Sequence, residues 1–210
     1  MHKPGKFITV EGIEGAGKST CLAVIAEQLT QHGITVNQTR EPGGTPLGEA
    51  LRELLLGHQQ SNMAADAELL MIFAARAEHI QQRIRPALSA GDWVLSDRFT
   101  DASYAYQGAG RGLDLARIAV LADWVQQDIK PDLTLLLDIP VKEGLHRAKQ
   151  RSAPDRFETE TLAFFEKVRA GYLQLAKQQP ERIVVIDASQ PLDQVQAAIH
   201  PVINRYLDDH

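Results

Sequence analysis

The amino-acid sequence predicts an α/β fold in which helices flank a five-stranded parallel sheet. Two observations support this prediction. Short runs rich in β-branched residues alternate along the 210-residue chain with long amphipathic segments, which is the pattern of a parallel sheet with helices on its faces. The run Leu-Thr-Leu-Leu-Leu at residues 133–137 shows little alternation of apolar and polar residues, as expected for a strand that is buried on both faces.

The predicted elements follow in order along the chain, separated by turn-forming residues. Five strands are expected at residues 6–10, 34–39, 93–96, 133–139 and 182–186. Seven helices are expected at residues 18–31, 46–56, 63–90, 114–129, 141–149, 158–178 and 192–207. Breakers lie between them at residues 32–33, 42–44, 57, 90–91, 108–112 and 131. The sequence shows no long linker and no internal repeat, so we expect a single domain over residues 1–210.

The charge balance excludes one class of function. The chain has 22 Lys and Arg residues against 27 Asp and Glu residues, a formal net charge of −5, which excludes a nucleic-acid-binding domain held mainly by positive charge. A hydrophobic content of 44% and a charged content of 23% are typical of an ordinary folded protein. The single cysteine, Cys21, can form neither an internal disulfide nor a Cys-based zinc cluster.

The sequence predicts no targeting or membrane segment. The predicted fold begins almost at the N-terminus, which leaves no room for an apolar signal segment. The longest apolar stretch, residues 69–75, is too short to span a bilayer. We therefore expect a soluble cytoplasmic protein with no membrane partner and no direct nucleic-acid partner.

Residues 12–19 match the pattern G-x-x-x-x-G-K-[ST] between a predicted strand and a predicted helix. In such a loop, backbone N–H groups converge on phosphate oxygens, and the helix adds the positive end of its dipole. Lys18 would neutralise the β- and γ-phosphates of ATP, and the Ser19 hydroxyl would bind Mg²⁺. The alternatives are a glycine-rich turn without a ligand and a dinucleotide-binding loop, which needs glycine where Thr20 stands. The expected ATP-phosphate-binding residues are Gly12, Ile13, Glu14, Gly15, Ala16, Gly17, Lys18, Ser19 and Thr20.

Further residues narrow the kind of nucleotide-binding protein. The sequence contains neither Asn-Lys-x-Asp nor Asp-x-x-Gly, which a GTPase switch requires, whereas a motor or partition ATPase stays possible on the loop alone. Asp97 and Arg98 follow a predicted buried strand, so they would lie at the carboxyl edge of the sheet beside the phosphate loop. There Asp97 can hold Mg²⁺ and Arg98 can bind a phosphate, although an ion pair at a strand end is the alternative. Arg52 and Arg76 are further candidates for phosphate or base contacts, or else surface arginines.

Over nearly its whole length the chain resembles the bacterial thymidylate kinases. The matching segments are residues 11–20, 39–44 (Thr-Arg-Glu-Pro-Gly-Gly), 73–76 (Phe-Ala-Ala-Arg), 97–99 (Asp-Arg-Phe), 105–108 (Ala-Tyr-Gln-Gly), 131–134 (Pro-Asp-Leu-Thr) and 187–191 (Asp-Ala-Ser-Gln-Pro). The resemblance implies the P-loop NTPase fold with a short lid. It also implies direct in-line transfer of the γ-phosphoryl group of ATP to dTMP with Mg²⁺, giving dTDP and ADP and feeding dTTP synthesis.

The resemblance assigns one group of residues to the phosphate side of the dTMP site. Arg98 would hold the dTMP phosphate, with Arg40 and Glu41 completing that side and Arg52 close to it. Glu11 would lie near the reacting phosphates, the metal and the acceptor nucleotide.

A second group is assigned to the base and the sugar. Arg76 would donate a hydrogen bond to a thymine carbonyl, Ser103 would approach the base from the next helix, and Gln107 would line the base pocket. Tyr106 would crowd the 2′ position of the sugar and so favour deoxyribose. The family commonly places a thymine-stacking Phe four residues before the base-reading Arg, but here that position is Ile72 and the phenylalanine is Phe73. Either side chain can therefore pack on the base, and Phe73 is the expected one.

A basic stretch at approximately residues 142–157 is the expected lid. It contains Lys142, Arg147, Lys149, Arg151 and Arg156 against only Glu143 and Asp155. In the family, the lid supplies an arginine where the phosphate loop has none after its acid, and here Gly15 follows Glu14. The resemblance therefore implies Arg151 as the catalytic lid residue, then Arg156, then Arg147, acting with Lys18 and Arg98. Without the resemblance, a solvated basic helix face explains the same charges.

Two other functions and one assembly stay open at this point. The chain can be a kinase for another nucleoside monophosphate, or a non-catalytic nucleotide-binding regulatory module. The resemblance also implies a homodimer packed through helices that flank the sheet. Segments 63–90 and 114–129 are candidates, although long apolar faces can equally belong to the core.

Overall fold

A computed structural model describes residues 5–57, 63–151 and 155–208 of the chain, apart from the side chain of Arg151. Its five strands form one parallel sheet in the order β2-β3-β1-β4-β5. The strands are β1 (Phe7–Glu11), β2 (Val36–Arg40), β3 (Trp93–Asp97), β4 (Leu133–Asp138) and β5 (Ile183–Asp187). The prediction of a five-stranded parallel sheet is confirmed. In the register of the central strands, Val10 pairs with Asp97 on one side and with Leu135 on the other.

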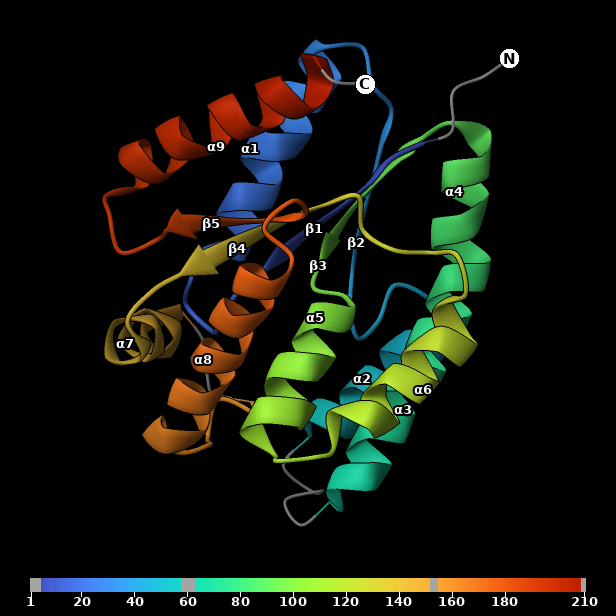
Figure 1. The fold of residues 1–210 in the computed structure, drawn as a ribbon, viewed down its shortest axis with the longest axis vertical. Coiled ribbons are helices and arrows are strands. Elements are labelled where there is room, and N and C mark those ends of the chain that lie inside the picture. Colours follow the sequence, from blue (N-terminus) through green and yellow to red (C-terminus); the bar gives the residue numbers. More distant parts are fainter. Residues whose placement is uncertain (1–4, 58–62, 152–154, 209–210) are drawn as a thin grey trace.

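Helices cover both faces of this sheet (Figure 1). On one face, α1 (Lys18–Gln31) and α9 (Leu192–Asp208) lie side by side. The other face carries α4 (Arg85–Ala90), α5 (Thr100–Ser103) and α8 (Leu162–Gln178). On that side α2 (Pro46–Leu56), α3 (Ala65–His79) and α6 (Leu115–Gln126) extend beyond the sheet. Finally, α7 (Val141–Arg151) follows the carboxyl end of β4.

The main core lies between the sheet and α1, α8 and α9. Leu135 and Leu136, neighbours in β4, are both buried, which confirms that this strand is covered on both faces. The same core cluster contains Ile25 of α1 and Phe165 of α8. Among the described residues, no helix combines the length and the apolar character needed to cross a membrane.

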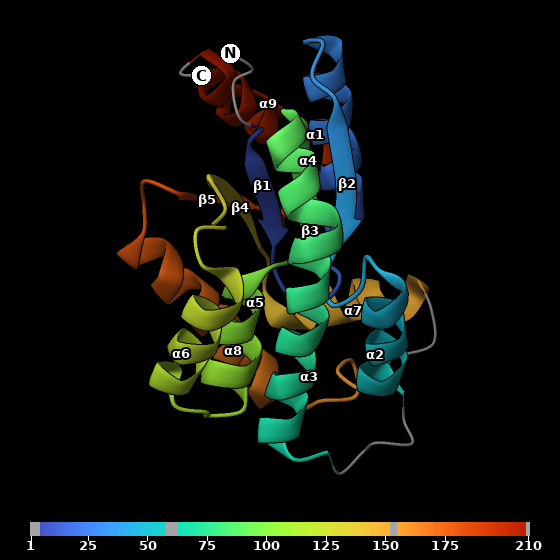
Figure 2. The same cartoon turned by 90° about the vertical axis from the view of Figure 1, so that its right-hand side faces the viewer.

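The segment predicted as one helix over residues 63–90 is divided into three. After α3 comes a π-helical turn, η2 (Ile80–Ile84), and only then α4. Pro86, in the first turn of α4, has no N–H group, and its ring would collide with the carbonyl four residues earlier in a regular helix. The wider turn before it lets the chain continue in nearly the same direction (Figure 2).

Another helical segment was missed by the element prediction. Residues 100–110 form α5 and a π-helical continuation, η3 (Tyr104–Gly110), although the glycines at 108–112 suggested a break. Here glycine permits close packing instead. A Cβ on Gly110 would lie 2.6 Å from the ring of Phe164, and a Cβ on Gly171 would lie 2.7 Å from Cβ of Ala109. The close contact between η3 and α8 therefore requires glycine at positions 110 and 171.

Two predicted helices begin at capping residues. The segment predicted to start at residue 158 becomes helical only at Leu162, where Thr161 accepts a hydrogen bond from the Phe164 N–H at 3.2 Å. Likewise, Asp114 caps α6 and accepts from the Ala116 N–H at 2.9 Å. Each cap satisfies a first-turn N–H that has no partner inside the helix.

Candidate active site

The segment between β1 and α1 is a tight loop that depends on glycine. Gly12, Gly15 and Gly17 have φ values of 141°, 73° and 90°, a region that other residues rarely adopt. A Cβ on Gly15 would lie 1.9 Å from the carbonyl oxygen of Gly144 at the start of α7. The loop therefore packs directly against α7 and leads into the N-terminus of α1, where unpaired N–H groups favour an anion.

Lys18 spans this loop from the first turn of α1. Its Nζ donates hydrogen bonds to the carbonyl oxygens of Gly12 at 3.2 Å and Ile13 at 3.1 Å. Burial, and then the nearby Arg98, lower the pKa of Lys18 to about 8. A bound phosphate would raise that pKa again, because an opposite charge favours the ammonium form. A bound anionic ligand would thus stabilise the ammonium form of Lys18.

Ser19 and Asp97 line one hollow beside the loop. Asp97 ends β3, and its Oδ1 is buried without a hydrogen bond to any described residue. A free carboxylate oxygen beside a hydroxyl suits a hard cation. Within the described ranges, no group of three or more His, Cys, Asp or Glu residues is arranged to hold a metal. The oxygen atoms of Ser19 and Asp97 fit Mg²⁺, which usually keeps water and phosphate oxygens as most of its ligands.

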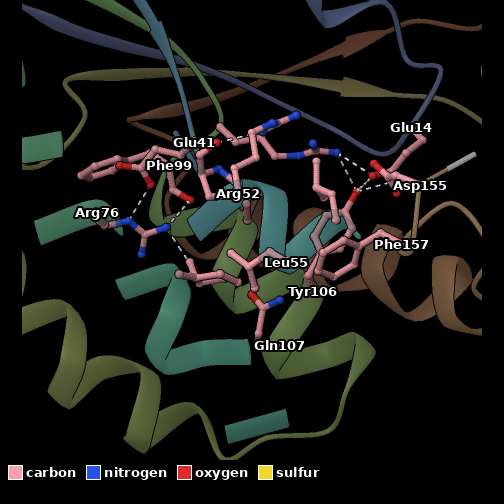
Figure 3. A pocket seen from close by; sticks show the side chains of 16 residues that line it. Glu14, Glu41, Arg52, Leu55, Arg76, Phe99, Tyr106, Gln107, Asp155 and Phe157 are labelled. Atoms are coloured by element: carbon pink, nitrogen blue, oxygen red, sulfur yellow. Dashed lines mark hydrogen bonds and ion pairs between the residues drawn. The ribbon is translucent and has the colours of Figure 1, made fainter. Parts of the chain in front are cut away.

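A pocket opens next to the loop, and its two ends differ in chemistry (Figure 3). At one end, Arg98 donates from Nη2 to Glu14 Oε1 at 2.9 Å and to the Tyr106 hydroxyl at 2.8 Å. That hydroxyl in turn donates to Glu14 Oε2 at 2.8 Å. Arg98 has a φ of 69°, so its side chain leaves β3 in an unusual direction, toward the loop. The result is a guanidinium fixed between the loop and the pocket.

Arg52 of α2 adds a second cation to this end. It lines the pocket and donates from Nη1 to the carbonyl oxygen of Pro42 at 2.8 Å. Burial, and then the positive charges of Arg40 and Arg98, lower the pKa of Arg52. Several positive charges close together create a positive potential, so this end of the pocket is suited to an anion such as a phosphate.

Arg76 of α3 marks the other end of the pocket. It donates from Nε to Glu41 Oε2 at 2.7 Å, and from Nη2 to Ser103 Oγ at 3.1 Å and the Phe99 carbonyl at 3.2 Å. Its guanidinium carbon lies 4.6 Å from the ring centre of Phe73 and 5.1 Å from that of Phe99. Nη1 is buried and makes no hydrogen bond within the described residues. Arg76 therefore offers one fixed, unpaired donor at the pocket.

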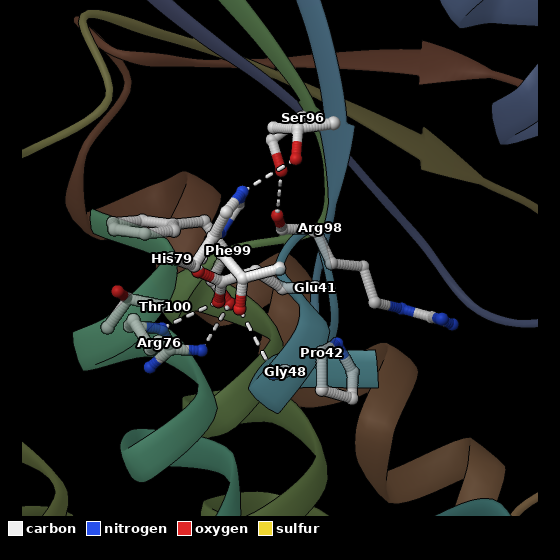
Figure 4. Close-up of polar contacts among 12 residues, drawn as sticks. Glu41, Pro42, Gly48, Arg76, His79, Ser96, Arg98, Phe99 and Thr100 are labelled. Carbon is white, nitrogen blue, oxygen red and sulfur yellow. Dashed lines mark hydrogen bonds and ion pairs between the residues drawn. The ribbon is translucent and has the colours of Figure 1, made fainter. Parts of the chain in front are cut away.

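A buried chain of polar groups holds Arg76 in place (Figure 4). Glu41 also contacts His79 Nδ1 at 2.9 Å, and His79 Nε2 contacts Thr39 Oγ1 at 2.6 Å. Although burial opposes its charge, Arg76 and His79 hold the pKa of Glu41 below its usual value. The carboxylate is thus ionised and fixes the direction of the Arg76 guanidinium.

Several residues lie elsewhere than the resemblance implied. Phe73 packs in an apolar cluster with Leu69 and Ile118 behind Arg76, whereas Ile72 lines the pocket. Arg40 is half exposed, pairs with Glu49 at 2.8 Å and lines the outer hollow with Ser19.

Glu11 does not line the pocket either. It is fully buried, and its oxygens accept from the Phe99 N–H and the Tyr172 hydroxyl, each at 2.7 Å. Burial, and then the nearby Asp101, raise the pKa of Glu11 to about 8. In this structure Glu11 supports the turn that carries Arg98.

The predicted lid arginines have different surroundings. Arg156 is buried, and it donates to Glu68 Oε2 at 2.6 Å and to the Leu55 carbonyl at 2.7 Å. Arg147 donates to the Ala188 carbonyl at 2.9 Å and lines a hollow beside Gly17 and Thr20. Arg151 is the last residue of α7, and its side chain lies outside the described residues.

Comparison with known proteins decides the family. A model of the thymidylate kinase family matches residues 10–199. The chain belongs to the thymidylate kinase family. Thymidylate kinase from Methylococcus capsulatus is 56% identical over 207 residues, covering 99% of each chain. Thymidylate kinase from Alkalilimnicola ehrlichii is 58% identical over 200 residues, covering 95% of this chain and 92% of the relative. The crystal structure of thymidylate kinase from Ehrlichia chaffeensis matches with a TM-score of 0.77 and 36% identity, covering 96% of this chain and 99% of that one.

Sequence reasoning missed part of this thymidylate kinase site. Glu68, Arg111 and His79 form buried polar contacts around the pocket, and none of them was singled out. Glu68 carried a usable indication, because it is an acid directly before the apolar run 69–75 of a helical segment. The partners of His79 and Arg111 are distant in sequence, so only the fold brings them together.

Proposed function

We propose that this member of the thymidylate kinase family transfers the γ-phosphoryl group of ATP to dTMP, producing dTDP and ADP. The observation that carries the proposal is the pocket beside the phosphate loop. One of its ends holds Arg98 and Arg52, and the other holds the unpaired Nη1 of Arg76. A nucleoside monophosphate has the same polarity, with a dianion at one end and a base with hydrogen-bonding groups at the other.

The reaction then follows from positioning and charge. The loop N–H groups and Lys18 bind the phosphates of ATP, while Arg98 and Arg52 bind the acceptor phosphate. The acceptor is already a phosphate oxygen, so the transfer needs no general base and no covalent enzyme intermediate. Tyr106 is hydrogen-bonded to both Arg98 and Glu14, and we expect it to exclude a 2′-hydroxyl group.

The metal has a defined place in this proposal. Ser19 and Asp97 would hold Mg²⁺, and the ion would neutralise charge on the transferring phosphates. Asp97→Asn should weaken Mg²⁺ binding, measured as a rise in the Mg²⁺ concentration needed for half-maximal activity.

The lid and the adenine side complete the nucleotide site. Arg151 would reach the transferring phosphoryl group, so Arg151→Ala should lower kcat by orders of magnitude and leave dTMP affinity nearly unchanged. A raised KM for dTMP at normal kcat would contradict that role. Arg147 lines the hollow next to Gly17 and Thr20, where it can hold the adenine end of ATP.

A homodimer is part of the proposal, with a cytoplasmic location. Exposed apolar side chains lie on α3 and α6, which pack against each other. Leu70 is 56% exposed, Val120 66% and Trp124 75%, and such surfaces commonly mark an interface between subunits. Trp124→Glu should convert a dimer into a monomer in light-scattering chromatography.

The deciding experiment is ADP release from MgATP by the purified protein, with dTMP, dUMP, UMP, AMP, GMP or no acceptor. A strong, selective response to dTMP would support the proposal. Turnover with another acceptor would keep the kinase and overturn the base assignment. ATP binding without acceptor-dependent turnover would favour a regulatory module.

A further inference from the structure

A buried carboxylate, Glu68, lies behind the base end of the pocket. It is 1% exposed. Its Oε1 accepts from Gln107 Nε2 at 2.9 Å and Arg111 Nε at 3.3 Å, and its Oε2 accepts from Arg156 Nη2 at 2.6 Å and Arg111 Nη2 at 3.2 Å. Glu68 thus joins α3 to η3 and to the end of the expected lid.

The charge of Glu68 dictates the orientation of the Gln107 amide. Burial opposes the charge, but hydrogen bonds from Gln107, Arg111 and Arg156 hold the pKa of Glu68 below its usual value. An ionised carboxylate can only accept, so Gln107 must direct its NH₂ group toward Glu68. The amide oxygen is then turned away from Glu68, and it makes no hydrogen bond within the described residues.

The free amide oxygen belongs to a side chain that lines the pocket with Arg76. Figure 3 shows Gln107 and Arg76 on the side of the pocket away from Glu14. Arg76 offers a donor there, and Gln107 offers an acceptor. A base that presents a carbonyl next to a ring N–H matches this pair, as thymine does at O4 and N3. Cytosine presents the reverse pattern, an amino group next to a bare ring nitrogen.

We propose that Glu68 is a specificity-determining positioning residue, which selects a 4-oxo pyrimidine over a 4-amino pyrimidine by fixing the Gln107 amide. Glu68 acts through Gln107 and does not touch the base. This inference rests on the proposed function for its substrate, and it goes beyond that function by assigning the choice of base to a residue outside the pocket.

Glu68→Gln has an outcome that the contacts define. Arg156 and Arg111 can only donate. Two of their N–H groups meet Oε2, at 2.6 and 3.2 Å, whereas one, Arg111 Nε, meets Oε1 at 3.3 Å. The new amide should therefore turn its oxygen toward the two Nη2 groups and its NH₂ toward Gln107, with loss of the longer Arg111 Nε contact. Gln107 must then present its oxygen to residue 68 and its own NH₂ group to the pocket. That NH₂ opposes the N3–H of thymine and matches the bare N3 of a cytosine.

The matched ligand pair is dTMP and 5-methyl-dCMP, which differ only at ring positions 3 and 4. For Glu68→Gln, the ratio of kcat/KM for dTMP to that for 5-methyl-dCMP should fall about tenfold or more, the effect of mispairing one buried hydrogen bond. The dTMP preference should persist in part, because Arg76 still favours a carbonyl. The ratio of dissociation constants, measured by calorimetry without ATP, should shift in the same direction.

Two further variants separate orientation from general damage. Arg111→Gln removes contacts to Glu68 but keeps its carboxylate, so the ligand ratio should stay at the wild-type value even if stability falls. Gln107→Leu keeps the Glu68–arginine contacts and removes the amide, so it should lower the ratio, and it serves if Glu68→Gln does not fold. An unchanged ratio in Glu68→Gln or Gln107→Leu, or an equal fall in Arg111→Gln, would overturn the inference. Failure of wild-type protein to phosphorylate dTMP would instead overturn the proposed function, and the calorimetric ratios would still test the role of Glu68.

Discussion

The phosphate loop and the acceptor pocket lie side by side but are constructed in different ways. The loop is one continuous segment, residues 12–19, and backbone groups and glycine geometry form most of it. The pocket is assembled from α2, α3, the turn after β3, and η3. Buried ion pairs such as Arg76–Glu41 and Arg156–Glu68 hold it together. The loop therefore depends on few side chains within one segment, whereas the pocket depends on many side chains that are distant in sequence.

The largest expected effect is on the loop side, at Lys18. Lys18→Met should lower kcat about a thousandfold, because it removes a charge aimed at the transferring phosphates. The dissociation constant of dTMP should change little, since the acceptor contacts lie on the pocket side. Coupled ADP-release kinetics and calorimetry measure the two quantities, and Lys177→Met, at an exposed site on α8, is the control. Equal losses in kcat and in dTMP affinity would mean that the two regions are not separable.

Glu11 connects the two regions, and its effect should depend on pH. Its pKa is raised to about 8 in the folded protein, while in the unfolded chain it titrates near its ordinary value of about 4.3. As pH rises between these values, the unfolded state loses its proton first. The folded state of the wild type should therefore lose about 3 kcal/mol of stability between pH 5 and pH 8 relative to Glu11→Gln. Urea unfolding at several pH values measures this difference.

The control for that pH dependence is Glu181→Gln, at an exposed position. The difference between this variant and the wild type should stay constant over the same pH range. If the difference in unfolding free energy between Glu11→Gln and the wild type is also constant with pH, then Glu11 is ionised in the folded state. A nearby positive charge would then compensate its burial between Phe99 and Tyr172.

A substitution of Arg156 tests whether the end of the expected lid is a structural part of the pocket. The resemblance implies Arg156 as the second choice for the catalytic lid arginine, after Arg151, and the structure pairs Arg156 with buried Glu68. Arg156→Met should lower the free energy of unfolding by about 2 kcal/mol, less than for a fully orphaned charge because Arg111 still neutralises Glu68. Arg117→Met, which removes an exposed pair with Asp66, should change it by less than about 0.5 kcal/mol. A stable Arg156→Met with greatly reduced kcat would restore the catalytic assignment.

The difference between the regions also explains what could be predicted from the sequence. The sheet and the loop were predictable, because strand periodicity and the spacing of Gly12, Gly17 and Lys18 are local properties. The surroundings of Arg156 and Glu11 were not, because their partners Glu68 and Tyr172 lie 88 and 161 residues away. Likewise, the glycines of η3 are typical of a helix break, since nothing nearby in sequence shows that α6 packs against Gly108 and α8 against Gly110.

The smallest expected effect lies where the two regions meet, at the Tyr106 hydroxyl. Tyr106→Phe removes one acceptor for Arg98 and one donor to Glu14, but Arg98 keeps its contact with Glu14. Losing these two hydrogen bonds, at about 0.5 kcal/mol each, should cost about 1 kcal/mol, so kcat/KM for dTMP should fall about fivefold. The control is Tyr104→Phe. Tyr104 lies two residues before Tyr106 in η3 and is only partly buried, so this variant should leave kcat/KM unchanged. A hundredfold loss in Tyr106→Phe would mean that the hydroxyl, rather than the Glu14 carboxylate, sets the direction of Arg98, and the boundary between loop and pocket would then depend on a single tyrosine.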